Sequence, residues 1–154
     1  MNTKVLFMLS TTLILFSTQL SANELVTGKS LYDDNCLSCH DANLDPPLAP
    51  PMFGVKHFYS RASSNEQDFI NKFTTFTLDP AQNEALMKDA VTVLGEMPNL
   101  DMAKEDVLLI SKYIFDTSFP PPCNHWLAGM KRAKAEGDTK HFKKDQRQFN
   151  KMCR

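Results

Sequence analysis

The stretch Cys36-Leu37-Ser38-Cys39-His40 decides how the rest of this 154-residue chain is interpreted. A Cys-x-x-Cys-His pentad is the attachment signature of c-type haem. Two thiols three positions apart on one helical turn can each bond to a vinyl group of the same porphyrin. The next residue then lies under the ring, where its imidazole can bind the iron. The pentad therefore predicts covalent haem c at Cys36 and Cys39, with His40 as the proximal iron ligand.

The alternatives to haem attachment are a chance pentad and two other uses of a Cys-x-x-Cys pair, a redox site and a zinc site. A thioredoxin-like redox site would sit in a strand–helix context, which the neighbouring sequence lacks. A zinc site would need a second pair of ligands at short spacing, and none stands out in the sequence. These alternatives are weaker than haem attachment.

The first 22 residues have the composition of an export signal. Lys4 supplies a positive charge, Val5 to Phe16 form an apolar run, and Leu20-Ser21-Ala22 offers a small-residue cleavage site. The apolar run is too short to span a bilayer comfortably. Residues 1–22 are therefore predicted to be a cleaved signal peptide, and the remaining protein is predicted to be soluble and periplasmic.

Charge is distributed unevenly along the remaining chain. Residues 23–119 carry seven Lys or Arg against fifteen Asp or Glu, a formal balance of −8. Residues 120–154 carry nine against three, a balance of +6. The overall formal charge of −1 hides this asymmetry.

Apolar residues at three- and four-residue spacing predict helices and no strands. The expected helices cover residues 24–35, 66–76, a segment from Asp79-Pro80 to about Gly95, and 103–116. Residues 41–51 form a proline-rich loop, and Pro120-Pro121-Pro122 ends the last of these helices. The predicted fold is all-α.

Residues 24–117 resemble a small class I c-type cytochrome. The resemblance is carried by the pentad and four further elements: Gly28-x-x-Leu31-Tyr32, Pro50-x-Met52-x-Gly54, Gly95-x-Met97-Pro98 and Tyr113-Ile114. It implies a cytochrome c fold of about four helices around one covalently bound haem, over residues 23–119. It also implies that Gly28 and Tyr32 meet the last of these helices near Leu109 and Tyr113.

The sixth iron position is assigned to Met97. A thioether there gives a high potential suited to electron transfer, and the following Pro98 stiffens the loop. The resemblance places the distal methionine in this loop, and Met52 where a side chain packs on the haem. It also implies that the Pro50 carbonyl accepts a hydrogen bond from the Nδ1–H of His40. Other methionines are expected in core or surface positions; His57, His125 and His141 are weaker candidates for the sixth ligand.

Residues 120–154 lie outside the resemblance and are predicted to form a basic helical hairpin. The first helix runs from Asn124 to Glu136, Gly137 ends it, and Asp138 caps the second. With Cys36 and Cys39 used by haem, Cys123 and Cys153 are predicted to form a disulfide, which an exported protein permits. The alternative is a free thiol that serves as a ligand, a redox site or an intermolecular bridge. The charge of this hairpin is compatible with contact to the acidic haem region, an acidic partner, anionic lipid, or solvent alone.

The function expected from these features is single-electron transfer between respiratory redox partners, by a carrier or the cytochrome subunit of a complex rather than an enzyme. The partners are redox proteins, docked through either the acidic haem region or the basic tail, and nucleic acid is not expected. The alternative is a haem enzyme or gas sensor with an open or displaceable sixth ligand. A third reading is a partner-binding module that keeps haem for stability.

Overall fold

A computed structural model describes residues 23–81 and 83–153. Its helices are a first helix over residues 23–35, α2 (Leu37–His40), α3 (Met52–Ala62), α4 (Glu66–Leu78), α5 (Lys88–Leu94), α6 (Lys104–Asp116), α7 (Cys123–Glu136) and α8 (Thr139–Met152). Across these two ranges no residue is in a strand, so the all-α prediction is confirmed. The predicted signal peptide lies outside the described residues.

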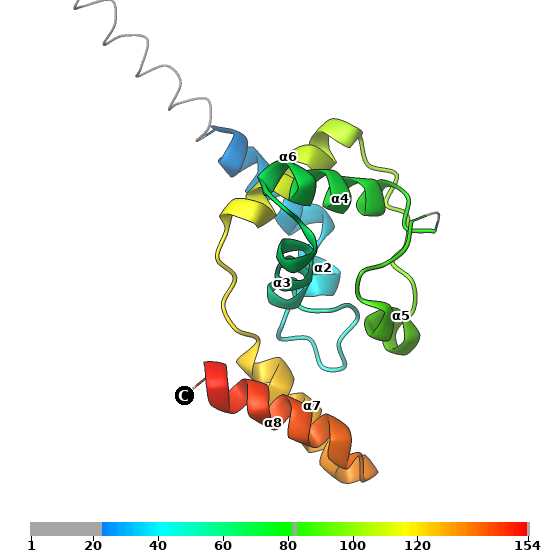
Figure 1. The fold of residues 1–154 in the computed structure, drawn as a ribbon, viewed down its shortest axis with the longest axis vertical. Helices are drawn as coiled ribbons and strands as arrows, with labels where there is room; N and C mark the ends of the chain where they lie inside the picture. Colours follow the sequence, from blue (N-terminus) through cyan, green and yellow to red (C-terminus); the bar gives the residue numbers. More distant parts are fainter. Residues whose placement is uncertain (1–22, 82, 154) are drawn as a thin grey trace, which may run out of the picture.

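The helices form two parts, which Figure 1 shows one above the other. The first part, called here the helical body, comprises residues 23–119. The second is the C-terminal hairpin, made of α7 and α8, which reaches the body through an extended segment after α6. In the described ranges, no helix has both the length and the apolar character needed to cross a bilayer.

The core of the helical body is built where α3 and α6 pack on α4. Asn65 caps α4 by accepting a hydrogen bond from the Asp68 backbone N–H. The apolar face of α4 buries Phe69 and Phe73. The Phe73 ring lies 5.2 Å from that of Tyr59 on α3. The opposing face of α6 buries three aliphatic side chains completely: Val107, Ile110 and Ile114.

The first helix crosses α6 at close range, as the resemblance implies. A Cβ on Gly28 would lie 2.4 Å from the Leu109 carbonyl oxygen and 2.9 Å from the Tyr113 Cβ. One turn along, the ring centroids of Tyr32 and Tyr113 are 5.4 Å apart. The predicted crossing is confirmed, and it directs the end of the first helix toward the cysteine pentad.

Helix α3 was not predicted: no element was expected between the proline-rich loop, which ends at residue 51, and the helix expected from residue 66. Its buried side chains are Met52, Val55 and Tyr59, which lie at helical spacing. Pro51 occupies the position before the first turn, where a missing N–H costs nothing. The Lys56 ammonium on α3 donates to the Phe115 and Thr117 carbonyls, both at 2.6 Å, and so satisfies the end of α6.

The helix predicted from Asp79-Pro80 is shorter than expected. It begins only at Lys88, as α5, and ends before Gly95, whose φ is +86°. In place of a helical turn, the Asn83 side chain donates to the Thr75 and Asp79 carbonyls, at 3.2 and 2.8 Å. Such side-chain bonds compete with helix formation, and residues 79–81 and 83–87 are not helical where they lead the chain to α5.

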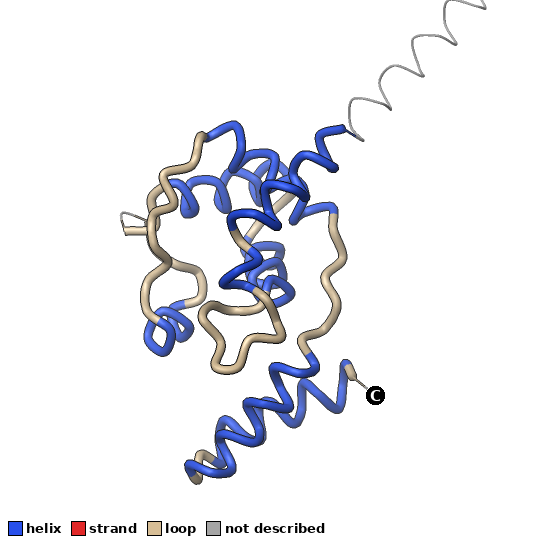
Figure 2. The backbone as a smooth tube through the Cα atoms, turned by 180° about the vertical axis from the view of Figure 1, so that it is seen from behind, coloured by secondary structure: helices blue, strands red, loops and turns tan. Residues whose placement is uncertain are grey.

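The C-terminal hairpin follows the predicted pattern. Gly137 adopts the left-handed conformation (φ +74°) at the end of α7, and the Asp138 carboxylate accepts from the Lys140 and His141 backbone N–H groups. In the structure Cys123 and Cys153 are joined by a disulfide, with their Cα atoms 5.9 Å apart. Figures 1 and 2 both show the hairpin lying beside the loop of residues 41–51.

Candidate haem-binding site

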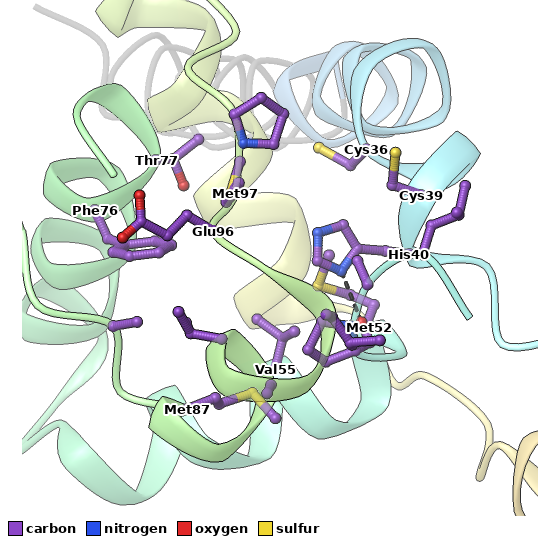
Figure 3. Close-up of a pocket in the computed structure, with 18 of the residues that line it drawn as sticks. Cys36, Cys39, His40, Met52, Val55, Phe76, Thr77, Met87, Glu96 and Met97 are labelled. Atoms are coloured by element: carbon purple, nitrogen blue, oxygen red, sulfur yellow. Dashed lines mark hydrogen bonds between the residues drawn. The ribbon is translucent and has the colours of Figure 1, made fainter. Parts of the chain in front are cut away.

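A largely apolar cavity opens between α2, α3, the end of α4, α5 and the loop that precedes α6. Its empty space, counted with the open solvent at its mouth, measures about 1050 Å³. Figure 3 shows Cys36, Cys39 and His40 together on one side of it. Its other lining residues include Leu48, Pro50, Met52, Val55, Tyr59, Phe73, Phe76, Thr77, Leu86, Met87, Val91, Leu94, Glu96 and Met97.

One helical turn brings the three pentad side chains to the cavity. The backbone N–H groups of Cys39 and His40 both donate to the Cys36 carbonyl, at 3.2 and 3.0 Å. Both cysteines are free thiols; Cys36 is buried and Cys39 exposed. Burial, and then the neighbouring Cys39, raises the pKa of the Cys36 thiol to about 11. A redox-active dithiol would need a lowered pKa, so this environment does not favour a thioredoxin-like site.

The His40 imidazole is held by the loop that follows the pentad. Its Nδ1 lies 2.7 Å from the Pro50 carbonyl oxygen, which can only accept, so Nδ1 carries the proton. Burial lowers the pKa of His40 and this hydrogen bond partly opposes that effect, so the ring is neutral at pH 7. Nε2 is thereby left as the electron-pair donor for a metal. The predicted contact between His40 and Pro50 is confirmed.

Three methionines line the cavity, from three different segments. Met52 is buried at the start of α3, Met97 is half-buried in the loop before α6, and Met87 lies directly before α5. In Figure 3, Met52 lies beside His40, whereas Met97 comes from a separate part of the wall. The sequence predicted Met52 and Met97 here, but it assigned Met87 to the core or the surface.

The donor atoms and the lining fit a haem. Apolar walls suit a porphyrin ring, and a neutral imidazole with a thioether is a ligand pair that iron accepts in cytochromes. Two free thiols on the same turn as the imidazole are placed for covalent attachment. Among the described residues, no three His, Cys, Asp or Glu side chains come together as a site for a bare metal ion.

The sequence model of the cytochrome c family matches residues 25–118, about three fifths of the chain. This chain belongs to the cytochrome c family. It is accordingly a haem-binding, electron-transfer cytochrome, and the family implies that the haem c is covalently bound. No curated protein and no solved structure matches the chain.

The match covers nearly the whole helical body of this cytochrome and stops before the C-terminal hairpin. It ends one residue before the predicted boundary at 119, and that boundary stays a prediction. His57, His125 and His141 do not line the cavity of the cytochrome; His57 is on α3, and the other two are in the hairpin.

Sequence reasoning missed several cavity residues of the cytochrome. Phe76 was expected on the apolar face of its helix, but not at the cavity, and Leu48 and Leu86 were assigned no role there. Met87 carried no sequence signal for this position, because its place at the cavity depends on the non-helical segment that precedes α5.

Proposed function

We propose that this cytochrome is an exported carrier of single electrons whose haem iron is held by His40 and Met97 in both oxidation states. The observation that carries the proposal is the His40 side chain, whose Nδ1 lies 2.7 Å from the Pro50 carbonyl oxygen at the wall of an apolar cavity beside two free thiols. When bound, haem c supplies a one-electron couple between ferric and ferrous iron.

The side chains around the cavity have roles that suit electron transfer. Pro50 fixes the orientation of the His40 ring and raises its basicity as a ligand. The apolar walls, among them Val55 and Phe73, keep water from the haem, and burial of this kind is one of the terms that sets a haem potential. Nothing in this proposal requires a substrate to be bound or a bond to be broken.

Met97 is proposed as the sixth ligand in preference to Met52 and Met87. A haem iron held by His40 and a methionine would need the two side chains to reach it from different sides of the cavity. Met52 lies on the same side of the cavity as His40, which suits a residue that packs against the ring. Met97 belongs to another segment, and Pro98 limits the backbone freedom of that segment.

Export to the periplasm is proposed from residues 1–22 and the cysteines. A positive charge followed by a short apolar run is typical of a cleaved signal. The disulfide between Cys123 and Cys153 would persist in an oxidising compartment. We propose redox proteins as partners, which the charge asymmetry between the helical body and the C-terminal hairpin would help to orient.

The optical spectrum of the purified protein tests the closed His/Met site. We expect a methionine–iron charge-transfer band in the ferric form and no carbon monoxide binding in the ferrous form. Absence of that band, together with ready carbon monoxide binding, would mean an accessible iron and would favour a haem enzyme or gas sensor instead.

Two matched variants identify the methionine ligand. Met97→Ala should abolish the charge-transfer band and lower the reduction potential, because a thioether ligand stabilises ferrous iron. The shift should be a measurable part of the roughly 0.8 V range that axial ligands span. Met52→Ala, the control, should keep the band and mainly loosen packing. A loss of the band in Met52→Ala alone would overturn the assignment of Met97.

A further inference from the structure

The C-terminal hairpin contacts the helical body at the loop that joins His40 to Pro50. The Asn124 side-chain amide on α7 donates to Asn43 Oδ1 at 3.0 Å. Two turns further along α7, the Arg132 guanidinium forms an ion pair with the Asp45 carboxylate. Figure 2 shows the hairpin running along this loop. Both polar contacts therefore join the hairpin to the first half of the 41–51 loop.

An aromatic contact continues this interface to the start of α3. The Trp126 ring of α7 meets the Phe53 ring edge-on, with centroids 6.1 Å apart and an angle of 88° between planes. Trp126 is only 9% exposed, although it lies outside the core of the helical body. Phe53 directly follows Met52, whose side chain lines the cavity. The hairpin thus contacts both the loop and Phe53, two residues beyond the end of the loop.

The 41–51 loop has few internal hydrogen bonds. Its internal hydrogen bonds in the structure join Asp41, Asn43 and Leu44 only. Its second half contains the prolines at 46, 47 and 50, which have no N–H to donate. Pro50 nevertheless has to place its carbonyl 2.7 Å from His40 Nδ1. The loop end is tied to the first turn of α3, where the Gly54 and Val55 backbone N–H groups donate to the Pro51 carbonyl at 2.8 and 3.2 Å. The position of the Pro50 carbonyl therefore depends on this turn and on the contacts that the loop and the turn receive from the hairpin.

We infer that the C-terminal hairpin is a clamp on this loop, and that Trp126 and Arg132 are positioning residues for His40. They act through Phe53 and Asp45 on the segment that carries the Pro50 carbonyl. The inference rests on the proposed function in one respect, namely that His40 is the iron ligand. It gives the hairpin, which lies outside the family match, a role in the properties of the haem.

Trp126→Leu and Arg132→Gln in the haem-loaded, full-length protein test the clamp. The measurements are the solvent-exchange rate of the His40 Nδ1 proton by NMR and the reduction potential. In Trp126→Leu the exchange should accelerate by about fivefold or more, and the potential should shift. Arg132→Gln should change the exchange rate and the potential in the same direction as Trp126→Leu but by a smaller amount, because exposed ion pairs contribute little. Arg132→Lys should restore part of the wild-type exchange rate and potential.

Lys134→Gln is the matched control, since Lys134 is an exposed cation on the same helix with no carboxylate partner within 4 Å in the described ranges. It should change neither measurement. The clamp is overturned if Trp126→Leu leaves the proton exchange and the potential at their wild-type values, whether or not the hairpin itself has unfolded. It is also overturned if Lys134→Gln changes them as much as Trp126→Leu does.

If the proposed function is wrong, the wild-type spectrum shows it, whatever the variants do. The wild-type protein would then lack covalent haem or have an iron ligand other than His40. The clamp is then decided by amide hydrogen exchange across residues 41–51, which needs no haem. Faster exchange there in Trp126→Leu than in Lys134→Gln supports the clamp, and equal rates overturn it.

Discussion

Gly28 is the position where a single added carbon would disturb the fold most directly. An alanine Cβ there would lie 2.4 Å from the Leu109 carbonyl oxygen and 2.9 Å from the Tyr113 Cβ, both parts of α6 that cannot rotate away. We expect Gly28→Ala to lower the free energy of unfolding by about 1–3 kcal/mol, the usual cost of overpacking. Thermal unfolding of the haem-loaded protein would measure it.

Gly54→Ala is the control for this prediction. Gly54 is inside α3, and an added Cβ there would meet only the Met87 Cε, at an ordinary 3.9 Å. Alanine also favours helix over glycine by roughly 1 kcal/mol, so this variant should be as stable as the wild type or more so. If both variants lost stability equally, the close crossing would not be the cause.

The sequence could predict the position of a residue where that position depends only on residues close to it in the chain. The pentad places Cys36, Cys39 and His40 within one turn, so their proximity follows from helix geometry alone. The Pro50 contact was inferred from family resemblance, because Pro50 lies ten positions after His40, at the far end of a loop. Met87 could not be placed, because its approach to the cavity depends on turns made by side-chain hydrogen bonds of Asn83.

At the scale of elements, helices were predictable where a long apolar face exists and both ends are marked. Helices α4 and α6 meet these conditions, and their predicted and observed bounds differ by two residues at most. Helix α5 does not meet these conditions, because Asp79-Pro80 resembles a helix start whereas the structure has a turn there. Helix α3 was not predicted, although its buried residues lie at helical spacing.

The hairpin is the element most dependent on a covalent bond. Helix α8 is strongly polar: Asp145 is its one buried residue, and Phe142 and Phe149 are half-buried. Closing a loop of 30 residues is worth about 3–4 kcal/mol in the chain-entropy model. We expect the double variant Cys123→Ser/Cys153→Ser to destabilise the hairpin by up to this amount, with faster amide hydrogen exchange in α8 than in α4.

Mass analysis under non-reducing conditions is the first check on that expectation. Two free thiols in the haem-loaded wild-type protein would contradict the disulfide between Cys123 and Cys153. Treating the wild type with a thiol reductant should reproduce the exchange seen in the variant. Unchanged α8 exchange after reduction would mean that side-chain packing alone holds the hairpin.

At the scale of the whole molecule, the seating of the hairpin on the 41–51 loop could not be predicted. The contacts that make it are single pairs, Asn124 with Asn43, Trp126 with Phe53 and Arg132 with Asp45, separated by more than 70 residues. None of them belongs to a periodic pattern or a motif. The difference in charge between residues 23–119 and 120–154, by contrast, could be predicted, because it follows from composition alone.

The separation of charge between the two parts predicts how the cytochrome reacts with small ionic oxidants. Glu96 borders the cavity, and the helical body has a formal balance of −8. The ferrous protein should therefore react faster with a cationic cobalt complex as salt is lowered, and slower with ferricyanide. The change should be on the order of tenfold between about 0.01 and 0.15 M salt, where the screening length falls from about 30 to 8 Å.

Helix α8 provides the variant that tests whether the hairpin contributes to this field. Its exposed cations recur at three- and four-residue spacing and so share one face: Lys140, Lys143, Lys144, Arg147 and Lys151. Replacing all five by Gln should raise the rate with the cobalt complex and lower the rate with ferricyanide at low salt. The difference from the wild type should shrink strongly near 0.15 M salt, because the screening length is then only about 8 Å. Rates that shift in the same direction for both oxidants would contradict an electrostatic origin.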